Sequence, residues 1–400
     1  MLERLLNTNH HQSTKEALSS IKESMSHNQK IADWTHILYK YPACFPPSFP
    51  RSVINSFSKP DDWIMDPFVG GGTSAVEAMV ARRNFVGTDI NDLAIFSSKL
   101  KTLLLTKADI RALDNWSKNL SGRNVEAEFR TGDEFYFKNV PKVVETSTRK
   151  IFAAIRQLPS RRTQNFAKGA LLRLGQLEIE QRLSVTDSAH AHRVFRQILN
   201  INIEQSIKLH LELEHGSIDF IPTSGIHIAN ATDPGIVDIW NQNDRQFSLV
   251  LTSPPYPERH ILYHKWQVNG RSETRLPYWI IESDQIENEP FYTMSSRESS
   301  ASLEIYISNM MLVFENINQV MQKNGVFVQV LAFSDLKNQL PLYLAAMNEA
   351  GFEEIRNIDR SSHDGRLWRE VPNRRWFNRV ESRQLRCKEV VLFHRKSRSV

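Results

Sequence analysis

The sequence is poor in the residues that build covalent or metal frameworks, and it has no long apolar run. Among 400 residues, only Cys44 and Cys387 are cysteines, which excludes a disulfide framework and a cysteine-based zinc site. No window is apolar over the length that a membrane span requires. The N-terminus carries early charge without an apolar core, so we expect no signal peptide. These absences predict a soluble cytoplasmic protein with no membrane partner.

The sequence also lacks a large excess of either sign of charge. The net charge is +5, and charged residues make up 24% of a chain that is 40% hydrophobic. That balance is typical of a globular protein, and it permits nucleic acid as a partner without requiring it. The pairs His10-His11 and His190/His192 lack acidic or cysteine companions at ligand spacing, so we predict no metal site.

Hydrophobic periodicity predicts an α/β protein in which the sheet is interrupted by helices. Residues 1–33 are polar with one helical patch, and we interpret them as an N-terminal helical arm. Strand and helix patterns alternate over 34–106 and again over 223–400, as in a doubly wound sheet. Residues 107–222 have mostly helical spacing and form a predicted insert.

The most informative stretch follows the apolar strand Phe247–Leu251. Two consecutive prolines, Pro254 and Pro255, cannot donate to a sheet ladder, so the strand must end there. Ser253 then offers a hydroxyl acceptor, Pro254 a carbonyl and Tyr256 an aromatic face. A planar base with an exocyclic amine would fit this arrangement, although an ordinary loop closing a strand is the alternative.

A glycine loop follows the strand that ends at Asp66. Gly70–Gly72 precede a helix that begins near Thr73, which is the strand–loop–helix pattern of nucleotide-type cofactor sites. It is not a phosphate-binding P-loop, because no Gly-Lys-Ser/Thr follows. Asp66 directly before the turn favours a cationic or hydroxyl-bearing ligand. The alternative is a glycine turn used only for packing.

Two further predicted strands end in acids. Asp89 lies 17 positions after Gly72, close to the spacing at which an acid accepts hydrogen bonds from ribose hydroxyls. Asp233 follows a third short strand, 225–229. Because carboxyl ends of parallel strands share one edge of a sheet, these acids are expected near the same ligand.

Basic residues gather in two places. Those at the centre of the insert are either solvated helix faces or nucleic-acid contacts, and the sequence leaves both open. In the C-terminal segment, planar cations alternate with aromatics, which suits phosphate contact and base stacking. The predicted nucleic-acid-binding residues there are Arg366, Arg369, Arg374, Arg375 and Trp376. Residues 257–300 lack periodicity and are predicted to be a long loop that acts as a lid or substrate-binding segment.

The two motifs together resemble those of the amino-group DNA methyltransferases. The resemblance rests on Asp66-Pro67-Phe68-Val69-Gly70-Gly71-Gly72-Thr73-Ser74 and Thr252-Ser253-Pro254-Pro255-Tyr256. It extends to Asp89 and to the aromatic-proline run 36–50, and it covers 34–105 and 225–400. In many relatives with this form of the glycine loop, the Pro-Pro-Tyr motif comes first, and Gly71 replaces a more usual serine.

The resemblance implies a Rossmann-like class I methyltransferase sheet with S-adenosylmethionine as cofactor. It implies that Ser253, Pro254, Pro255 and Tyr256 form the catalytic motif. The implied cofactor-binding residues are Asp66, Phe68, Gly70, Gly72, Thr73, Asp89 and Asp233. The serine form of the motif is associated with N4 of cytosine, and the Asp or Asn form with N6 of adenine.

The implied function is a site-specific N4-cytosine methyltransferase acting on double-stranded DNA in restriction–modification or phage defence. A cognate restriction endonuclease or defence-system protein would then be a partner. The insert is one candidate for the target-recognition region, and residues 257–300 with 365–386 are the other. Two alternatives remain open: an N6-adenine or RNA base methyltransferase, and a non-catalytic nucleic-acid-binding scaffold.

Overall fold

The computed structural model describes most of the chain. The described residues are 14–26, 33–42, 44–120, 126–127, 129, 132–180, 182–214, 222–257, 266–268, 272–283, 302–359, 361–377 and 384–399.

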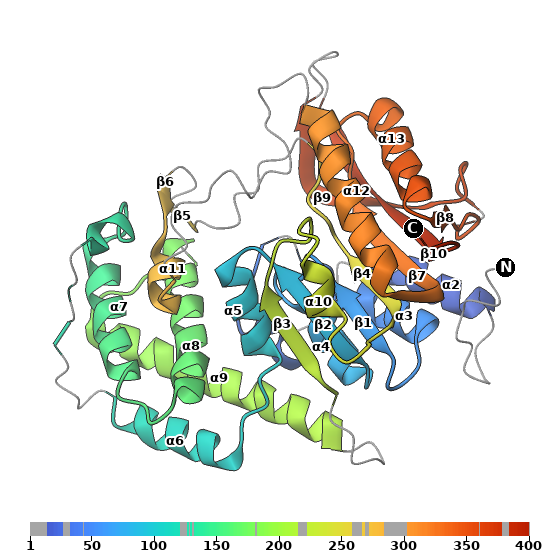
Figure 1. Cartoon of the computed structure of the whole chain (residues 1–400). Coiled ribbons are helices and arrows are strands. Elements are labelled where there is room, and N and C mark those ends of the chain that lie inside the picture. Colours follow the sequence, from blue (N-terminus) through green and yellow to red (C-terminus); the bar gives the residue numbers. More distant parts are fainter. Residues whose placement is uncertain are drawn as a thin grey trace.

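An eight-stranded sheet forms the centre of the protein (Figure 1). The strand order is β3-β2-β1-β4-β7-β10-β8, with β9 paired to β10. Strands β3, β2, β1, β4 and β7 are parallel to one another, whereas β10 runs antiparallel to β7, β8 and β9. The strands are β1 (Trp63–Asp66), β2 (Asn84–Asp89), β3 (Ser224–Ile228), β4 (Phe247–Thr252), β7 (Met321–Leu331), β8 (Phe352–Glu354), β9 (Leu367–Phe377) and β10 (Gln384–Lys396).

Helices cover both faces of this sheet, as the doubly wound prediction requires. Successive residues of a strand point to opposite faces, so Ile64 packs in one core while its neighbour Met65 packs in the other. The first core is covered by α2 (Thr14–Ser26), α3 (Ser48–Phe57), α4 (Thr73–Val80) and α5 (Asp92–Lys101). The second is covered by α10 (Ile236–Trp240), α12 (Ser302–Val320) and α13 (Leu336–Glu349). The α/β fold class is therefore confirmed.

The strand order reverses direction between β1 and β4. From β1 the chain proceeds to β2 and β3 on one side, while β4 and β7 lie on the other. Open α/β sheets bind ligands at this kind of reversal, beyond the carboxyl ends of the strands. The glycine loop follows β1 and the Ser-Pro-Pro-Tyr motif follows β4, so both motifs lie at the reversal.

A group of helices lies to one side of the sheet (Figure 1). It contains α6 (Lys107–Lys118), η2 (Asp133–Phe135), α7 (Lys142–Ile155), α8 (Arg161–Ile179) and α9 (Ser188–Glu214). One hydrophobic core joins these helices to α5 and to the short helix η1 (Trp34–Ile37) with the residues that follow it.

The prediction of a structureless loop over 257–300 is wrong for its described part. Residues there form the hairpin β5 (Trp266–Val268) and β6 (Ser272–Thr274), followed by α11 (Leu276–Ile281). α11 packs against α8 and α5, and the Trp266 side chain donates a hydrogen bond to the Tyr39 hydroxyl at 2.9 Å. The insert thus shares one hydrophobic core with the described part of 257–300, whereas no described residue of 365–386, which the sequence predicts to act together with 257–300, belongs to that core.

Candidate functional site

Side chains of α5 hold the glycine loop by hydrogen bonds. The carbonyl of Gly70 accepts a hydrogen bond from the Ser98 hydroxyl at 2.8 Å, and that of Gly71 accepts one from the buried Lys101 ammonium at 2.7 Å. A Cβ on Gly72 would lie 2.8 Å from the Ser98 Cα, and Gly72 has φ of +79°. Because a trans peptide directs its N–H away from its carbonyl, the Gly71 amide points away from α5. The Gly72 amide donates to the Val69 carbonyl at 2.9 Å, which closes the loop.

The aromatic-proline run covers the other side of this loop. A Cβ on Gly71 would lie 2.6 Å from the Tyr41 Cβ, so only glycine fits beneath the tyrosine. The run is anchored to α4 because Glu77, which is fully buried, pairs with His36 at 2.8 Å and with Arg51 at 2.8 Å. The loop is therefore fixed on both sides.

Asp66 does not face the site in the way that the sequence interpretation requires. Its side chain is only 2% exposed. The carboxylate accepts hydrogen bonds from the hydroxyls of Ser74 and Thr252, each at 2.5 Å, and from the Phe68 amide at 3.1 Å. Burial raises its pKa to about 6. Asp66 therefore joins the start of α4 to the end of β4, and a direct contact with the methionine part of a cofactor is not what its geometry supports.

Asp89 lies at the end of β2, beside the glycine loop. Its carboxylate accepts hydrogen bonds from the Gly70 amide at 3.0 Å and from the Asn91 amide at 2.9 Å. The side chain is half-buried, and desolvation raises its pKa to about 6. Within the described residues, neither Asp66 nor Asp89 forms an ion pair, and Asp89, the less buried of the two, is the carboxylate that a cationic or hydroxyl-bearing ligand could reach.

The Ser-Pro-Pro-Tyr motif is held in place by two strands and a helix. The Ser253 hydroxyl donates to the Val330 carbonyl on β7 at 3.0 Å. The Pro255 carbonyl accepts from the Tyr306 hydroxyl of α12 at 2.8 Å. The Tyr256 hydroxyl donates to Glu389 on β10 at 2.9 Å. Pro254 is buried, whereas Ser253, Pro255 and Tyr256 are half-buried.

Phe68, Thr73 and Asp233 complete the predicted cofactor-binding set. Phe68 is half-buried against the second core, and Thr73 is the first residue of α4. Asp233 is exposed, and its carboxylate accepts a hydrogen bond from the Gly235 amide at 2.9 Å. That bond shapes the turn before α10 and does not direct the Asp233 carboxylate toward the glycine loop.

The predicted nucleic-acid residues divide into two groups. Arg366 is buried and pairs with Glu354 at 2.6 Å and Asp364 at 3.1 Å. Arg369 pairs with Glu389 at 2.5 Å. Both guanidinium groups are used within the protein, so the sequence interpretation of these two as DNA contacts is not supported. The strand β9 also contains Arg374, Arg375 and Trp376, whose side chains lie outside the described part.

Several basic residues of the insert are likewise paired internally. Arg149 is buried, pairs with Asp133 and lies over the rings of Phe137 and Trp279. The other paired cations and their partners are Arg162 with Asp109, Lys168 with Glu282 and Arg182 with Glu180. For these residues, the interpretation as structural charges is the one that the contacts favour.

Lys101, Tyr306 and Glu389 were missed from the sequence, and Thr252 was named in the motif without its contact to Asp66. Each acts on a partner far along the chain, so local patterns give no sign of it. Glu389 carries one weak signal, an acid directly before the apolar run 390–393. Because β10 is antiparallel, its N-terminal end reaches the edge at which the parallel strands end.

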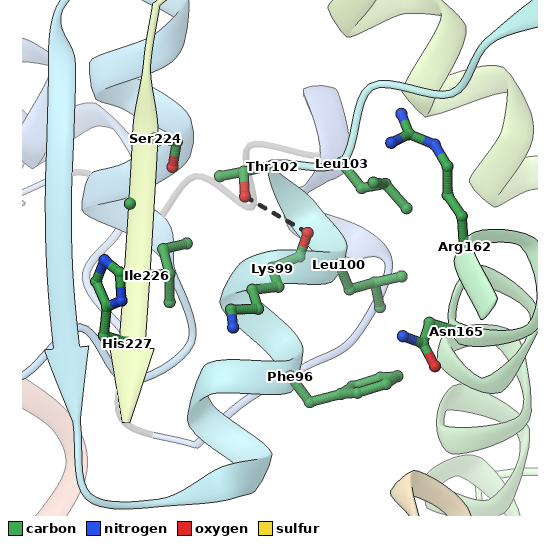
Figure 2. A pocket seen from close by; sticks show the side chains of 11 residues that line it. Phe96, Lys99, Leu100, Thr102, Leu103, Arg162, Asn165, Ser224, Ile226 and His227 are labelled. Atoms are coloured by element: carbon green, nitrogen blue, oxygen red, sulfur yellow. Dashed lines mark hydrogen bonds between the residues drawn. The ribbon is translucent and has the colours of Figure 1, made fainter. Parts of the chain in front are cut away.

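A cavity of about 580 Å³ lies elsewhere. Figure 2 shows it between α5, α8 and β3, lined by residues such as Phe96, Leu100, Arg162 and His227. None of the predicted site residues lines it, so it is not the candidate site. No group of three potential metal ligands occurs in the described residues, and no described helix is long and apolar enough to cross a membrane.

Comparisons with known proteins agree with these motifs. A family model of N6/N4 type, described as DNA methylase, matches residues 5–98. The chain is 24% identical over 268 residues to the Type II methyltransferase M.MvaI of Kocuria varians, covering 57% of this chain and 54% of the relative. It is 27% identical over 117 residues to the Type II methyltransferase M.MjaII of Methanocaldococcus jannaschii, covering 29% of this chain and 22% of the relative.

The chain thus spans between about a fifth and about half the length of these two relatives. Among solved structures, the rRNA methyltransferase aviRa from Streptomyces viridochromogenes matches with a TM-score of 0.37 and 9% identity, over 94% of this chain and 97% of that one.

Proposed function

We propose that the chain is an amino-group DNA methylase that uses S-adenosylmethionine and methylates the exocyclic N4 amine of cytosine in double-stranded DNA, and its similarity to DNA methylases supports this proposal. The observation that carries the proposal is the hydrogen bond that links the two motifs. The Thr252 hydroxyl donates to Asp66 at 2.5 Å across the reversal of strand order. The cofactor-type loop and the Ser-Pro-Pro-Tyr loop are therefore fixed next to each other.

Ser253 is set up as a hydrogen-bond acceptor. A carbonyl oxygen can only accept, so the hydroxyl proton of Ser253 is committed to Val330 in the 3.0 Å bond between them. The lone pairs of Ser253 are then left for a donor such as an amine hydrogen. The nitrogen lone pair of a base amine is delocalised into the ring. Hydrogen bonds from the amine to Ser253 and to the Pro254 carbonyl would favour pyramidalisation and direct that lone pair toward the methyl group.

The residues around the glycine loop fit S-adenosylmethionine, which carries a sulfonium and an ammonium. Burial raises the pKa of Asp66 and of Asp89 to about 6, and no basic side chain is paired with either in the described residues. A bound cation would offset that desolvation. When bound, the cofactor supplies an electrophilic methyl group. Asp89 would accept hydrogen bonds from the ribose hydroxyls. Asp66 would act indirectly, by fixing the start of α4 and the end of β4.

The remaining cofactor contacts are assigned by position. The Gly70–Gly72 backbone and Thr73 would hold the methionine part. Among these amides, that of Gly71 points away from α5, whereas that of Gly70 donates to Asp89 and that of Gly72 to the Val69 carbonyl. Phe68 would lie against the cofactor, and Asp233 would approach the adenine edge. Asp233 is the least supported of these assignments, because it is exposed and its carboxylate shapes its own turn.

A base within a duplex cannot reach a motif held between strands, so the target nucleotide would be flipped out and stacked on Tyr256. We place the protein in restriction–modification or phage defence, where a cognate endonuclease would be a partner. The cytosine assignment rests on the serine at position 253.

The test is mass spectrometry of nucleosides from host DNA, with and without the expressed protein. N4-methylcytosine should appear with the wild type and fall at least tenfold with Ser253→Ala, because that variant removes one positioned acceptor. Isothermal titration should show unchanged affinity for S-adenosylmethionine. Ser248→Ala is the control, since that hydroxyl lies in β4 away from the motif.

Other outcomes would redirect the proposal. N6-methyladenine would keep the reaction and overturn the cytosine assignment. Modified bases confined to RNA would overturn the DNA substrate. If S-adenosylmethionine does not bind the wild type, the chain is a nucleic-acid-binding scaffold.

A further inference from the structure

The phenol of Tyr256 is held by an ion pair from two other strands. Its hydroxyl donates to the Oε1 atom of Glu389 at 2.9 Å. The other oxygen of Glu389 accepts from the Arg369 guanidinium, whose Nε lies 3.1 Å away. Glu389 and Arg369 are directly opposite each other across β10 and β9. Tyr256, Glu389 and Arg369 therefore form a connected chain that leads away from the Ser-Pro-Pro-Tyr motif.

We propose that Glu389 and Arg369 are positioning residues that fix the Tyr256 ring for stacking on the flipped base. This inference rests on the proposed function, because it concerns the same site. A tyrosine ring turns about two side-chain bonds, and its stacking face is defined only when both are fixed. The loop fixes the backbone of Tyr256, and the bond from the hydroxyl fixes the far end of the ring.

Glu389 suits this role because its own position is rigid. It lies on a sheet strand, and it is 4% exposed. A buried carboxylate is costly without a partner, so Arg369 makes it possible to keep a charge at this place. A hydrogen bond to an ionised acceptor is stronger than one to a neutral acceptor. The pair therefore holds the phenol more firmly than a carbonyl or water would.

The same contacts change the interpretation of Arg369. Its guanidinium is committed to Glu389, and its side chain is 20% exposed. It would thus support base stacking indirectly, through Glu389 and Tyr256, without touching phosphate. This explains why a cation that resembles a DNA contact in the sequence lies next to a buried acid in the structure.

The experiment combines Tyr256→Phe, Glu389→Ala and Glu389→Gln with the double variant of the first two. Tyr256→Phe keeps the ring and the ion pair and removes only the hydroxyl, which donates to Glu389 at 2.9 Å and lies 3.5 Å from the Ser253 hydroxyl. Initial rates of methyl transfer into unmethylated DNA give kcat and KM, and isothermal titration gives the affinity for S-adenosylmethionine. Glu353→Gln is the control, because it changes an acid that pairs with Arg395 near the C-terminal end of β10, away from the motif.

Tyr256→Phe and Glu389→Ala should each lower kcat/KM for DNA about tenfold to a hundredfold, the range for one hydrogen bond to a charged group. The double variant should be no worse than either single variant, because both remove the same bond. Glu389→Gln keeps an acceptor oxygen but loses the charge, so its kcat/KM should lie between that of Glu389→Ala and that of the wild type. Cofactor affinity should be unchanged throughout, and Glu353→Gln should behave as wild type.

The proposal fails if Tyr256→Phe has wild-type kinetics, whatever the Glu389 variants do. It also fails if the losses from Tyr256→Phe and Glu389→Ala multiply, because Glu389 then acts by another route. A loss of cofactor binding in Glu389→Ala, with Tyr256→Phe active, would assign Glu389 a structural role only. An inactive wild type would instead overturn the proposed function, so the two failures are distinguishable.

Discussion

Replacing Asp66 by asparagine should flatten the pH dependence of stability in the absence of ligand. The ordinary pKa of this acid is 3.8, and burial raises it to about 6 in the folded protein. The folded state therefore holds the proton at pH values where the unfolded chain has released it. The contribution of Asp66 to the free energy of unfolding is therefore present at low pH. It is lost as the pH rises from the pKa of Asp66 in the unfolded chain through its pKa in the folded protein.

The size of the effect follows from these two pKa values. A difference of about two pH units corresponds to about 3 kcal/mol at pH 8, relative to the fully protonated state. Roughly half of that, about 1.4 kcal/mol, falls between pH 5 and pH 8. Solvent screening requires little discount, because the side chain is 2% exposed. The amide introduced by Asp66→Asn cannot titrate, and the Ser74 and Thr252 hydroxyls can turn to accept hydrogen bonds from it.

The assay is urea unfolding at pH 5 and pH 8 for the wild type and Asp66→Asn. The wild type should lose about 1.4 kcal/mol more than the variant over this interval. Asp238→Asn removes an exposed acid on α10 and serves as the control. If Asp66→Asn loses as much stability as the wild type between the two pH values, then Asp66 is ionised at little cost, and the reasoning about its burial is wrong.

Two further predictions concern ligands. Affinity for S-adenosylmethionine should rise between pH 5 and pH 7, because hydroxyl donors prefer the ionised Asp89 carboxylate, whose pKa is about 6. In calorimetric titrations, Asp89→Ala should weaken binding at least tenfold and abolish this rise with pH. The double change Arg374→Ala and Arg375→Ala should weaken DNA binding and lower the slope of log K against log salt by up to about 2. Arg366→Ala is its control, because that guanidinium is already paired, and an unchanged slope in the double variant would contradict a role for β9 in DNA binding.

The sequence alone is sufficient to predict the parts of the site that depend on neighbouring residues. Strand ends at Asp66 and Asp89, the start of a helix at Thr73 and the end of β4 before the prolines are all where the patterns indicate. These features follow from apolar runs, glycines and prolines, whose effects act over a few residues. The α/β fold class and the family resemblance therefore require no tertiary information.

The assignments for which the contacts favour another role share a physical cause. The sequence predicts that Asp66 faces a ligand, but its partner Thr252 is 186 positions away along the chain. It also predicts that Arg369 contacts DNA, but Glu389 lies opposite this arginine on the next strand. A charge's role depends on which opposite charge or hydroxyl the fold brings beside it, and spacing in the sequence does not specify that.

Strand direction explains why the site draws on the C-terminal part of the chain. A parallel strand presents its last residues at the ligand edge, as β1 does with Asp66 and β4 with Thr252. A strand that runs the other way presents its first residues there. Because β10 is antiparallel to β7, Val390 pairs with Leu331 near the end of β7, and the preceding Glu389 reaches Tyr256. The antiparallel strand β10 thus brings Glu389 to the motif. If β10 ran parallel to β7, Glu389 would lie at the opposite edge of the sheet.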